Sequence, residues 1–270
     1  MSAINIEECK TGLVPGAVKR AVTLGEGVSY TEKQFSNREG KNVDVYTVYV
    51  APNAKAHVEV AVTPWGTTAT VPDQATALAA TGKAVLAAVN AGFFHLAAGT
   101  LDPYGMQIVD GKVINEPNDR DMMHSNSWFG VTFGGKYVIS DTKGYESVYR
   151  GTLRFGIGGG YRHMINGVVQ VPEDTGYHPF TAIAITKEGG VALALADGRT
   201  ERSADVSCYD MLDIFADMGL ALKDMMLLDG GGSTTVVTRE ADGLLLRNNP
   251  SEGGVLRPVS DIIAVVASEG

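Results

Sequence analysis

Alternating and continuous apolar runs predict that strands dominate this chain. Residues 43–50 (VDVYTVYV) alternate apolar and polar positions, which is typical of a strand with one buried face. Residues 225–229 and 262–267 are apolar almost throughout, which predicts strands buried on both faces. The same criteria, with Gly, Pro or Asp at the boundaries, predict further strands at 57–62, 84–90, 181–186, 191–197 and 234–238.

Two segments have the pattern of helices. In residues 73–82, Asp73 is the expected N-cap and Gly82 the expected stop. In residues 204–218, apolar side chains recur at three-residue spacing on one face, and Gly219 ends the run.

These elements predict a fold of the α+β class. Strands outnumber helices, and no linker, low-complexity segment or internal repeat divides the chain. We therefore expect a strand-rich single domain with a central mixed β-sheet and a few packed helices. This domain is expected over residues 41–270, after a less regular lead-in over residues 1–40.

Charge and hydropathy exclude several classes of partner. The 270 residues carry 22 Lys and Arg against 31 Asp and Glu, a formal net charge of −9, with no basic run longer than Lys19-Arg20. Nucleic acid is therefore not an expected partner, because neutralising its backbone needs clustered basic residues. No run of about eighteen apolar residues exists, so no membrane span is expected. The first ten residues lack the basic region and apolar core of a signal peptide.

The most informative stretch is LLDGGGSTTVV, residues 227–237, where three glycines separate two apolar runs. A phosphate loop should open a helix, but the β-branched residues that follow predict a strand. A hydrolase nucleophile elbow would need glycine where Thr235 stands. Two interpretations remain: a glycine-rich hairpin with nothing bound, or a turn whose bare backbone lies against a ligand beside Asp229.

Three predicted strands end in a polar residue with glycine close behind: Asn90, Asp197 and Asp229. Polar groups that converge at strand ends are where a mostly apolar scaffold carries a site. For Asn90 the alternative is an Asx turn that satisfies its own backbone. Together these ends favour a cleft that presents an amide and carboxylates.

Other candidate motifs are weaker. GIGGGYRHM (156–164) has Tyr161 where a dinucleotide fingerprint needs its third glycine, so a turn followed by a hairpin at Asn166-Gly167 is favoured. The five histidines and two cysteines lack the spacing of a zinc site, although a single bridge between Cys9 and Cys208 stays open. His178, which precedes a predicted core strand, is the histidine of most interest.

Taken in order, seven motifs resemble those of a known family. They are NAGFF (90–94), YGMQIVDGKVI (104–114), TAIAI (181–185), LADGRT (195–200), LLDGGGSTTVV (227–237), NNP (248–250) and LRPVSDIIAVV (256–266). Their order and spacing resemble the phosphodiester glycosidases, and the resemblance runs from about residue 84 to 267. LDGGGST followed by RPVS is its most specific part.

The resemblance implies a glycoside hydrolase that breaks the C1–O bond of a sugar-1-phosphodiester, for example one of N-acetylglucosamine, and releases free sugar and a phosphomonoester. Glycosyl transfer passes through an oxocarbenium-like state that a carboxylate stabilises. Asp229 and Asp197 are the candidates, one as nucleophile or stabiliser and the other as base for water, with the two roles unassigned. The family also suggests an extracellular or cell-envelope location.

The resemblance further implies a set of substrate-binding groups. Phosphate is a good leaving group, so cationic contacts to its oxygens matter more than a strong general acid. The expected contacts to phosphate are Arg199, Arg257 and the backbone N–H groups of Gly230, Gly231 and Gly232. The expected contacts to hydroxyl, acetamido or phosphate groups are Asn90, Ser233 and Thr234. Ca²⁺ or Mg²⁺ held by Asp197, Asp229 and a phosphate is compatible with these residues, but no spacing requires it.

Phe180 departs from the family pattern, which carries arginine before Thr-Ala-Ile. If that arginine binds phosphate, its absence removes a contact worth about 1.5–3 kcal/mol. Arg162 or His178 could replace it, or Phe180 could stack on a sugar face. The substitution leaves two alternatives open: a glycosidase for a non-phosphate glycan, and a non-catalytic carbohydrate-binding or virion or cell-surface module that retains the fold.

Overall fold

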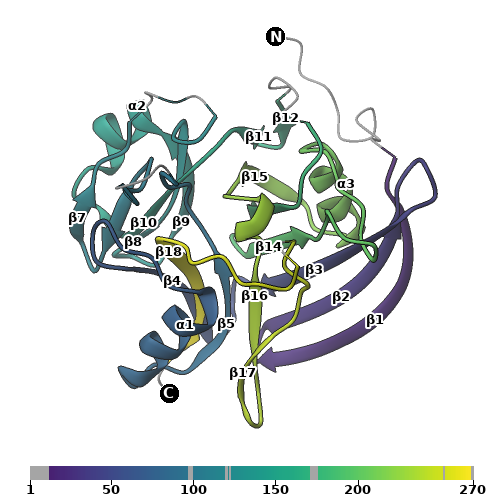
Figure 1. Cartoon of the computed structure of the whole chain (residues 1–270). Helices are drawn as coiled ribbons and strands as arrows, with labels where there is room; N and C mark the ends of the chain where they lie inside the picture. Colours follow the sequence, from purple (N-terminus) through teal and green to yellow (C-terminus); the bar gives the residue numbers. More distant parts are fainter. Residues whose placement is uncertain are drawn as a thin grey trace.

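Three β-sheets form the framework of the computed structural model, which describes residues 12–96, 100–118, 121, 123–170, 176–251 and 253–268. Figure 1 shows the largest sheet on one side of the molecule and a five-stranded sheet on the other. In spatial order, the eight-stranded sheet is β1 (Val14–Gly25), β2 (Val28–Ser36), β3 (Asn42–Val50), β14 (Val191–Ala196), β13 (Phe180–Thr186), β15 (Leu222–Leu227), β11 (Arg162–Ile165) and β12 (Val168–Val169).

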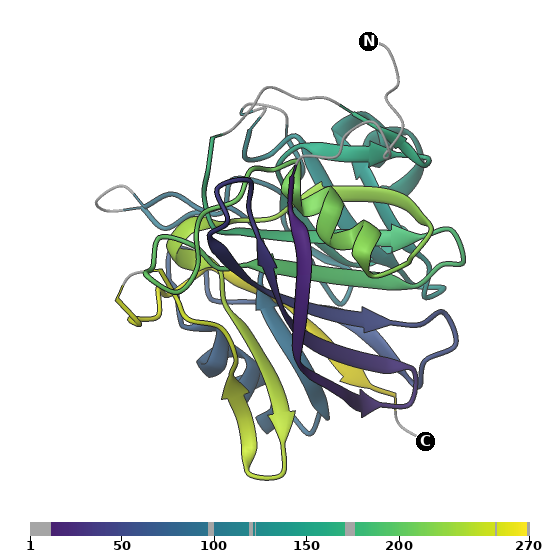
Figure 2. The ribbon, with the colours of Figure 1, turned by 90° about the vertical axis from the view of Figure 1, so that its right-hand side faces the viewer.

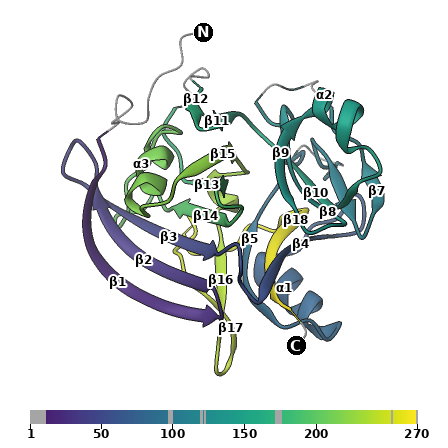
Figure 3. The ribbon, with the colours of Figure 1, turned by 180° about the vertical axis from the view of Figure 1, so that it is seen from behind.

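Two five-stranded sheets complete the framework. One has the order β7 (Lys112–Asn115), β6 (Gln107–Val109), β10 (Leu153–Gly159), β8 (Ser127–Thr132) and β9 (Tyr137–Asp141). The other has the order β17 (Gly243–Leu246), β16 (Val236–Glu240), β5 (Val85–Asn90), β18 (Asp261–Ala267) and β4 (Ala56–Val62). Seen from behind in Figure 3, the hairpin of β16 and β17 extends away from the other strands.

The inner faces of the three sheets share one apolar core. Val48, Ile183 and Leu193 reach it from the large sheet, while Val89 and Phe155 come from the two smaller ones. Helices cover the outer faces: α3 (Asp210–Asp217) packs on the large sheet, α1 (Val71–Ala80) on the sheet of β16, and α2 (Thr142–Gly144) leads into the π-helical turn Tyr145–Tyr149 on the sheet of β8. Figure 2 shows α3 lying across its sheet.

The expected mixed sheet is wrong, because every strand pair in the described residues is antiparallel. The segment β4–α1–β5 is a crossover that leaves its two strands parallel in direction. β18 inserts between them and pairs antiparallel with both, through Val265 opposite Val58 and Ala87. The α+β class and the dominance of strands are confirmed.

The expected lead-in also needs correction. Val14–Gly25 and Val28–Ser36 are strands of the large sheet, and residues 1–11, including Cys9, lie outside the described residues. Most of β1 is exposed, so its sequence lacks the alternation by which a half-buried strand is predicted.

Both predicted helices exist with different starts. The N-cap of α1 is Thr70, whose Oγ1 accepts a hydrogen bond from Asp73 N. The second helix begins at Asp210 instead of residue 204. Ser207 and Asp210 bond reciprocally as in a capping box, while Val206 forms a bridge with His178 and is extended.

Candidate active site

Asp229 lies where the chain leaves the large sheet after β15 and crosses to β16 in a neighbouring sheet. Leu228 N donates to Thr181 O at 2.9 Å, and Asp229 N donates to Ala91 O at 2.8 Å. The side-chain amide of Asn90 donates to Asp229 O at 2.6 Å. Contacts from β13 and from the end of β5 therefore fix the backbone of Asp229, which is what placing a reacting group requires.

Asn90 is completely buried and joins three segments. Besides its bond to Asp229, its Oδ1 accepts hydrogen bonds from Thr181 Oγ1 at 2.8 Å and from Thr235 N at 3.1 Å. Asn90 and Asp229 thus meet, as the strand ends predict. The Asn90 amide faces the loop backbone, and the residue does not line the cavity described next.

A cavity of about 200 Å³ opens beside Asp229. Its lining combines one carboxylate with cationic, imidazole and aromatic groups. The lining residues are Phe93, Met123, His124, Tyr161, His178, Pro179, Phe180, Arg199, Leu227, Asp229, Gly230 and Gly231. Asp229 is the one carboxylate among these described residues. This arrangement, an apolar wall with a few convergent polar groups, is typical of a small-ligand site.

The electrostatic surroundings of Asp229 raise its pKa to about 6. Burial is the largest cause, because it disfavours the charged carboxylate. The nearby Ser233 hydroxyl, the charge of Arg257 and the N–H of Gly230 act in the opposite direction. Gly230 N donates to Asp229 Oδ1 at 2.8 Å, whereas Ser233 Oγ does not meet hydrogen-bond geometry with any described group. A carboxyl group with this pKa exchanges its proton near neutral pH.

Arg199 and His178 form a hydrogen-bonded pair that also lines this cavity. Arg199 Nη2 lies 2.7 Å from His178 Nδ1. Because guanidinium groups only donate, Nδ1 accepts, and the ring proton of a neutral His178 sits on Nε2. Arg199 has a positive φ of 56°, and a Cβ on Gly231 would lie 3.3 Å from its Nη1. The guanidinium therefore lies directly against the glycine turn, next to Asp229.

His124 was missed by the sequence interpretation, which looked for zinc-type spacings. Its Nδ1 lies 2.7 Å from Asp121 Oδ2, and its ring meets Phe93 edge to face at a centroid distance of 4.9 Å. Burial raises the pKa of Asp121, but the hydrogen bonds from His124 and from the Met123 N–H outweigh it and lower the pKa. The signal in the sequence is the carboxylate three residues before the histidine.

The glycine triplet serves the protein's own packing as well as the cavity. A Cβ on Gly230 would lie 2.5 Å from Pro179 O, and Gly231 has a φ of 59°. The predicted contact of backbone with ligand is compatible with Gly230 and Gly231, which both line the cavity. Their N–H groups, however, already donate to Asp229 Oδ1 and to Pro179 O.

Asp197, the second predicted catalytic carboxylate, does not lie in the cavity beside Asp229. It is 2% exposed and lines neither this cavity nor the larger groove described below. Asn248 Nδ2 donates to its Oδ1 at 2.8 Å, while Asn249 N and the Tyr46 hydroxyl donate to Oδ2 at 2.8 and 3.2 Å. Burial raises its pKa to about 6. Since Asn248 also donates to Thr234 O, Asp197 is linked through Asn248 to the loop that follows Asp229.

The remaining expected contacts are distributed around the loop. Ser233 and Thr234 are buried outside the cavity lining, with hydroxyls that have no hydrogen-bond partner among the described residues. Arg257 acts on Asp229 through its charge but does not line the cavity.

The residues considered in place of the family arginine have other contacts. Arg162 donates a hydrogen bond to Asp141 Oδ2 at 2.7 Å and so does not replace the family arginine. Phe180 occupies the wall and meets His178 edge to face at 5.9 Å.

Asp261 is a further buried carboxyl group, and the sequence interpretation did not single it out. It accepts hydrogen bonds from Gly92 N and Gln107 Nε2, both at 2.6 Å, and from Ser260 Oγ at 2.8 Å. Its pKa is raised to about 6, mainly by burial and to a smaller extent by the charge of Asp229, while the three hydrogen bonds oppose the rise. Residues of three family motifs therefore meet at the Asp261 side chain, which is close enough to Asp229 for their charges to interact.

A divalent cation site is not formed by the described residues, which contain no group of three or more His, Cys, Asp or Glu arranged to hold a metal. Asp197 and Asp229 are not brought into one cavity. Within the described ranges no helix is long and apolar enough to cross a membrane.

Comparison with protein families decides the affiliation. The family of phosphodiester glycosidases matches residues 83–266, more than half of the chain. The chain belongs to this family. The match confirms the resemblance carried by the motifs between residues 84 and 267. A hydrolase is the activity that this family suggests.

Solved structures confirm the fold. The zebrafish N-acetylglucosamine-1-phosphodiester α-N-acetylglucosaminidase catalytic domain, auto-inhibited by its pro-peptide, is 17% identical with a TM-score of 0.62, over 96% of this chain and 89% of that one. A hypothetical protein from Synechocystis is 16% identical with a TM-score of 0.64, over 93% and 64% of the two chains. A Burkholderia pseudomallei K96243 protein, named provisionally as exported, is 12% identical with a TM-score of 0.63, over 94% and 97%.

One curated relative is the SPbeta prophage-derived uncharacterized protein YomE of Bacillus subtilis (strain 168). It is 34% identical over 88 residues, which are 33% of this chain and 13% of the relative. The chain thus matches a small part of that protein's length.

Proposed function

We propose that this phosphodiester glycosidase family member hydrolyses a sugar-1-phosphodiester by breaking the C1–O bond. Water adds to the anomeric carbon, and the products are the free sugar and a phosphomonoester. The observation that carries the proposal is the setting of Asp229: a carboxyl group with a raised pKa, held by backbone bonds from two sheets, in a cavity that Arg199 borders. An extracellular or cell-envelope location is part of this proposal, and the provisional name of the Burkholderia protein agrees with it.

Asp229 is the proposed nucleophile or stabiliser of the oxocarbenium-like state. Its ionised oxygens carry the negative charge that such a transition state needs, and the surrounding low polarity strengthens their attraction to it. The raised pKa keeps the carboxylate reactive at neutral pH while making it protonated in mild acid. Its fixed backbone limits the reorganisation required during the reaction.

His124 is the proposed base that activates water. The lowered pKa of Asp121 keeps that carboxyl group ionised, so it accepts a hydrogen bond and His124 Nδ1 donates. In neutral His124 the lone pair is then on Nε2, the atom that can take a proton from water. The sequence interpretation gave this task to an aspartate. Because all the bonds of Asp197 point to protein groups, we assign Asp197 a positioning role instead.

Arg199 and His178 are the proposed contacts to the leaving phosphate. Both border the cavity, and Arg199 lies against Gly231 on the Asp229 side. A guanidinium binds phosphate oxygens through parallel N–H groups, which stabilises the charge that develops as the C1–O bond breaks. At the cavity wall, Phe180 stands where the family pattern has an additional arginine. We propose that the Phe180 ring packs against the apolar face of the sugar.

The test is incubation with UDP-N-acetylglucosamine, a soluble sugar-1-phosphodiester, followed by phosphorus NMR and free-sugar analysis with and without added divalent cations. The expected products are UDP and N-acetylglucosamine. Asp229→Asn should abolish their formation, whereas Asp242→Asn, an exposed residue in the β16–β17 turn, should not.

The rival is a non-catalytic carbohydrate-binding module, or a glycosidase for a non-phosphate glycan. Phe180 favours both, since it places a flat apolar ring in the cavity wall where the family pattern carries an arginine. No turnover of UDP-N-acetylglucosamine, with N-acetylglucosamine still bound in the cavity, would contradict the proposed hydrolysis and support the binding module.

A further inference from the structure

His95, Tyr104 and His124 form a stack of aromatic rings, the ring stack, which reaches the active cavity at His124. The His95 ring stacks on the Tyr104 ring, with centroids 3.8 Å apart and an angle of 26° between the two planes. The Tyr104 ring stacks in turn on the His124 ring, with centroids 5.1 Å apart and an angle of 29°. Stacked pairs of this kind attract each other beyond the burial of their area.

We propose that Tyr104 is a positioning residue for the catalytic base, and that stacking on its ring fixes the plane of the His124 imidazole. The inference rests on the proposed function, because it takes His124 as the group that accepts a proton from water. Tyr104 does not line the cavity, so it acts through His124 and not on the substrate.

Two short paired stretches of chain hold Tyr104 next to His95. Tyr104 N donates to Phe93 O, and His95 N donates to Asp102 O, both at 2.9 Å. Phe93 and His95, two residues apart, both contact the ring stack. Phe93 meets the His124 ring edge to face at 4.9 Å, while His95 covers Tyr104. One stretch of chain therefore contacts two members of the stack.

Further hydrogen bonds tie the backbone of Tyr104 to the segment that carries His124. Asn118 Nδ2 donates to Tyr104 O at 2.8 Å. Asn118 Oδ1 accepts a hydrogen bond from the hydroxyl of Ser125, the residue after His124, at 3.1 Å. The position of Tyr104 relative to His124 is thus set by hydrogen bonds as well as by stacking.

The hydrogen bond to Asp121 does not by itself orient the His124 ring. It selects the tautomer with the lone pair on Nε2. The χ2 torsion of histidine has broad minima, however, so one hydrogen bond leaves the plane of the ring free to turn. The His124 side chain is 32% exposed, and core packing therefore does not fix it either. Because a base must present its lone pair within reach of the water, the plane set by Tyr104 decides whether Nε2 can accept the proton.

The ring stack also suits the charge that His124 gains in the reaction. Once it has taken a proton from water, the imidazole is a cation, and an aromatic face at this distance attracts a cation. Packing of the apolar core does not account for the stack. None of its three rings is fully buried, and none belongs to the apolar clusters of the core.

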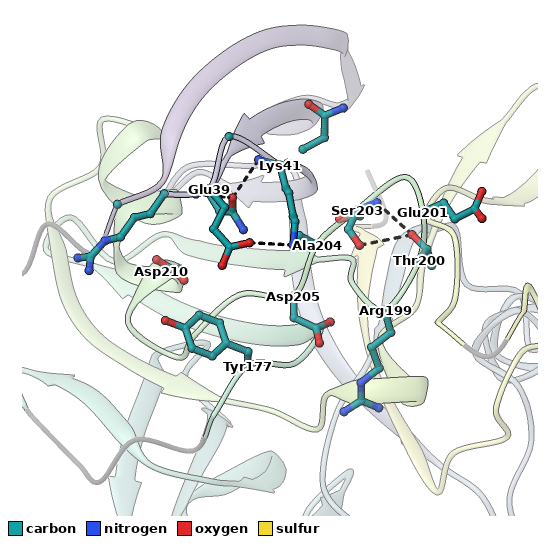
Figure 4. Close-up of a pocket in the computed structure, with 15 residues that line it drawn as sticks. Glu39, Lys41, Tyr177, Arg199, Thr200, Glu201, Ser203, Ala204, Asp205 and Asp210 are labelled. Atoms are coloured by element: carbon teal, nitrogen blue, oxygen red, sulfur yellow. Dashed lines mark hydrogen bonds and ion pairs between the residues drawn. The ribbon is translucent and has the colours of Figure 1, made fainter.

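The proposed phosphate contacts come from other segments than the ring stack. Arg199 borders the cavity and also a groove of about 990 Å³ between the β2–β3 turn and the segment 199–205, which Figure 4 shows. None of the three residues of the ring stack lines this groove. A substitution in the stack should therefore change proton transfer with little effect on substrate binding.

The test compares variants in the hydrolysis of UDP-N-acetylglucosamine, with kcat normalised to folded protein. Tyr104→Leu removes the ring, so kcat should fall about tenfold while KM changes less than about twofold. Tyr104→Phe keeps the ring and should retain kcat within about twofold. His95→Ala removes the outer ring and should lower kcat about threefold. The control Tyr149→Leu removes a half-buried ring that meets Trp128 edge to face at 5.4 Å, and it should leave kcat unchanged.

A second readout needs no turnover. Nitrogen-15 NMR of the histidine side chains shows whether the proton of neutral His124 is on Nδ1 or on Nε2. The wild type, Tyr104→Phe and Tyr149→Leu should show the Nδ1–H form. Tyr104→Leu should show a mixture of the two forms, because the ring then turns away from Asp121 for part of the time.

The outcomes separate the two proposals. Wild-type kcat in Tyr104→Leu, an equal loss in Tyr104→Phe, or a His124 spectrum that Tyr104→Leu does not change would overturn the positioning role and leave the hydrolysis intact. If Tyr104→Leu does not fold, unchanged kcat in His95→Ala overturns it instead. No hydrolysis by the wild type would overturn the proposed function, and the spectra would then decide whether Tyr104 orients His124.

Discussion

Asp229 and Asp197 are alike in sequence and in titration but differ in their contacts. Each follows an apolar strand, precedes a glycine and has its pKa raised to about 6 by burial. Asp197 receives three hydrogen bonds from protein groups, whereas Asp229 Oδ1 accepts one from its neighbour Gly230 and borders a cavity. A raised pKa therefore does not by itself distinguish the carboxyl group that we propose to react from the one to which we assign a positioning role. The two groups differ instead in the number of hydrogen bonds that their carboxylate oxygens accept from the protein.

The largest effect is expected at Asp229. Asp229→Asn keeps the shape and removes the charge that meets the transition state, so kcat should fall on the order of 10³-fold. The folded state should not lose stability, because a partly buried carboxylate is replaced by a neutral group. Steady-state hydrolysis and thermal unfolding measure the two effects. A variant that unfolds at a lower temperature and retains its kcat would make Asp229 structural.

Asp197→Ala should have the opposite signature. It leaves the Asn248 amide, the Asn249 N–H and the Tyr46 hydroxyl without their acceptor, which should lower the free energy of unfolding by roughly 3 kcal/mol. Urea denaturation measures the loss. The kcat per folded molecule should change far less than in Asp229→Asn, and an equal loss of kcat would contradict the positioning role.

The neighbouring asparagines sharpen the comparison further. Asn248 bonds Asp197, Thr234 O and Val236 N through its side chain, whereas Asn249 reaches Asp197 through its backbone. Asn248→Ala should therefore cost about 2 kcal/mol of unfolding free energy, and Asn249→Ala less than about 0.5 kcal/mol. Paired urea titrations test this order. Equal losses would mean that the Asn248 network does not hold the loop.

The smallest expected effect is a difference in pH dependence. A folded-state pKa of about 6 exceeds that of an exposed aspartate, about 3.9, so both groups contribute stability that is complete below about pH 4 and lost as the pH rises through 6. Asparagine at either position should flatten that decline in unfolding free energy. In kcat/KM, however, the rise with pH near 6 should persist in Asp197→Asn, since it reports ionisation of Asp229. If Asp197→Asn abolished this rise of kcat/KM with pH, the rise would report ionisation of Asp197 instead.

Sequence patterns predicted the buried strands well. A strand buried on one face alternates apolar and polar residues, and a strand buried on both faces is a continuous apolar run. The strands predicted over residues 43–50 and 262–267 are β3 and β18, each of which begins one residue earlier. The exposed β1 has neither pattern. The mixed sheet was wrong for a different reason: the position of β18 between β4 and β5 depends on long-range pairing, which local patterns do not encode.

The candidate site was predicted in part. The glycine triplet led to Asp229, a family motif led to Arg199, and its position before a predicted core strand led to His178; all three line one cavity. His124 and Asp261 were missed, because each gains its setting from partners in other segments: Phe93 for the first, and Gly92 and Gln107 for the second. Asp197 shows the opposite limitation. A motif at the end of a strand suggested a site residue, but it does not reveal which protein groups will donate hydrogen bonds to the carboxylate.

The most direct test of the central claim is the kcat for UDP-N-acetylglucosamine hydrolysis by Asp229→Asn and Asp197→Asn, each normalised to the concentration of folded protein. The two substitutions are chemically identical, and both groups have the same raised pKa. The account predicts that turnover is lost in Asp229→Asn and largely retained in Asp197→Asn. Turnover that survives in Asp229→Asn but vanishes in folded Asp197→Asn would contradict it.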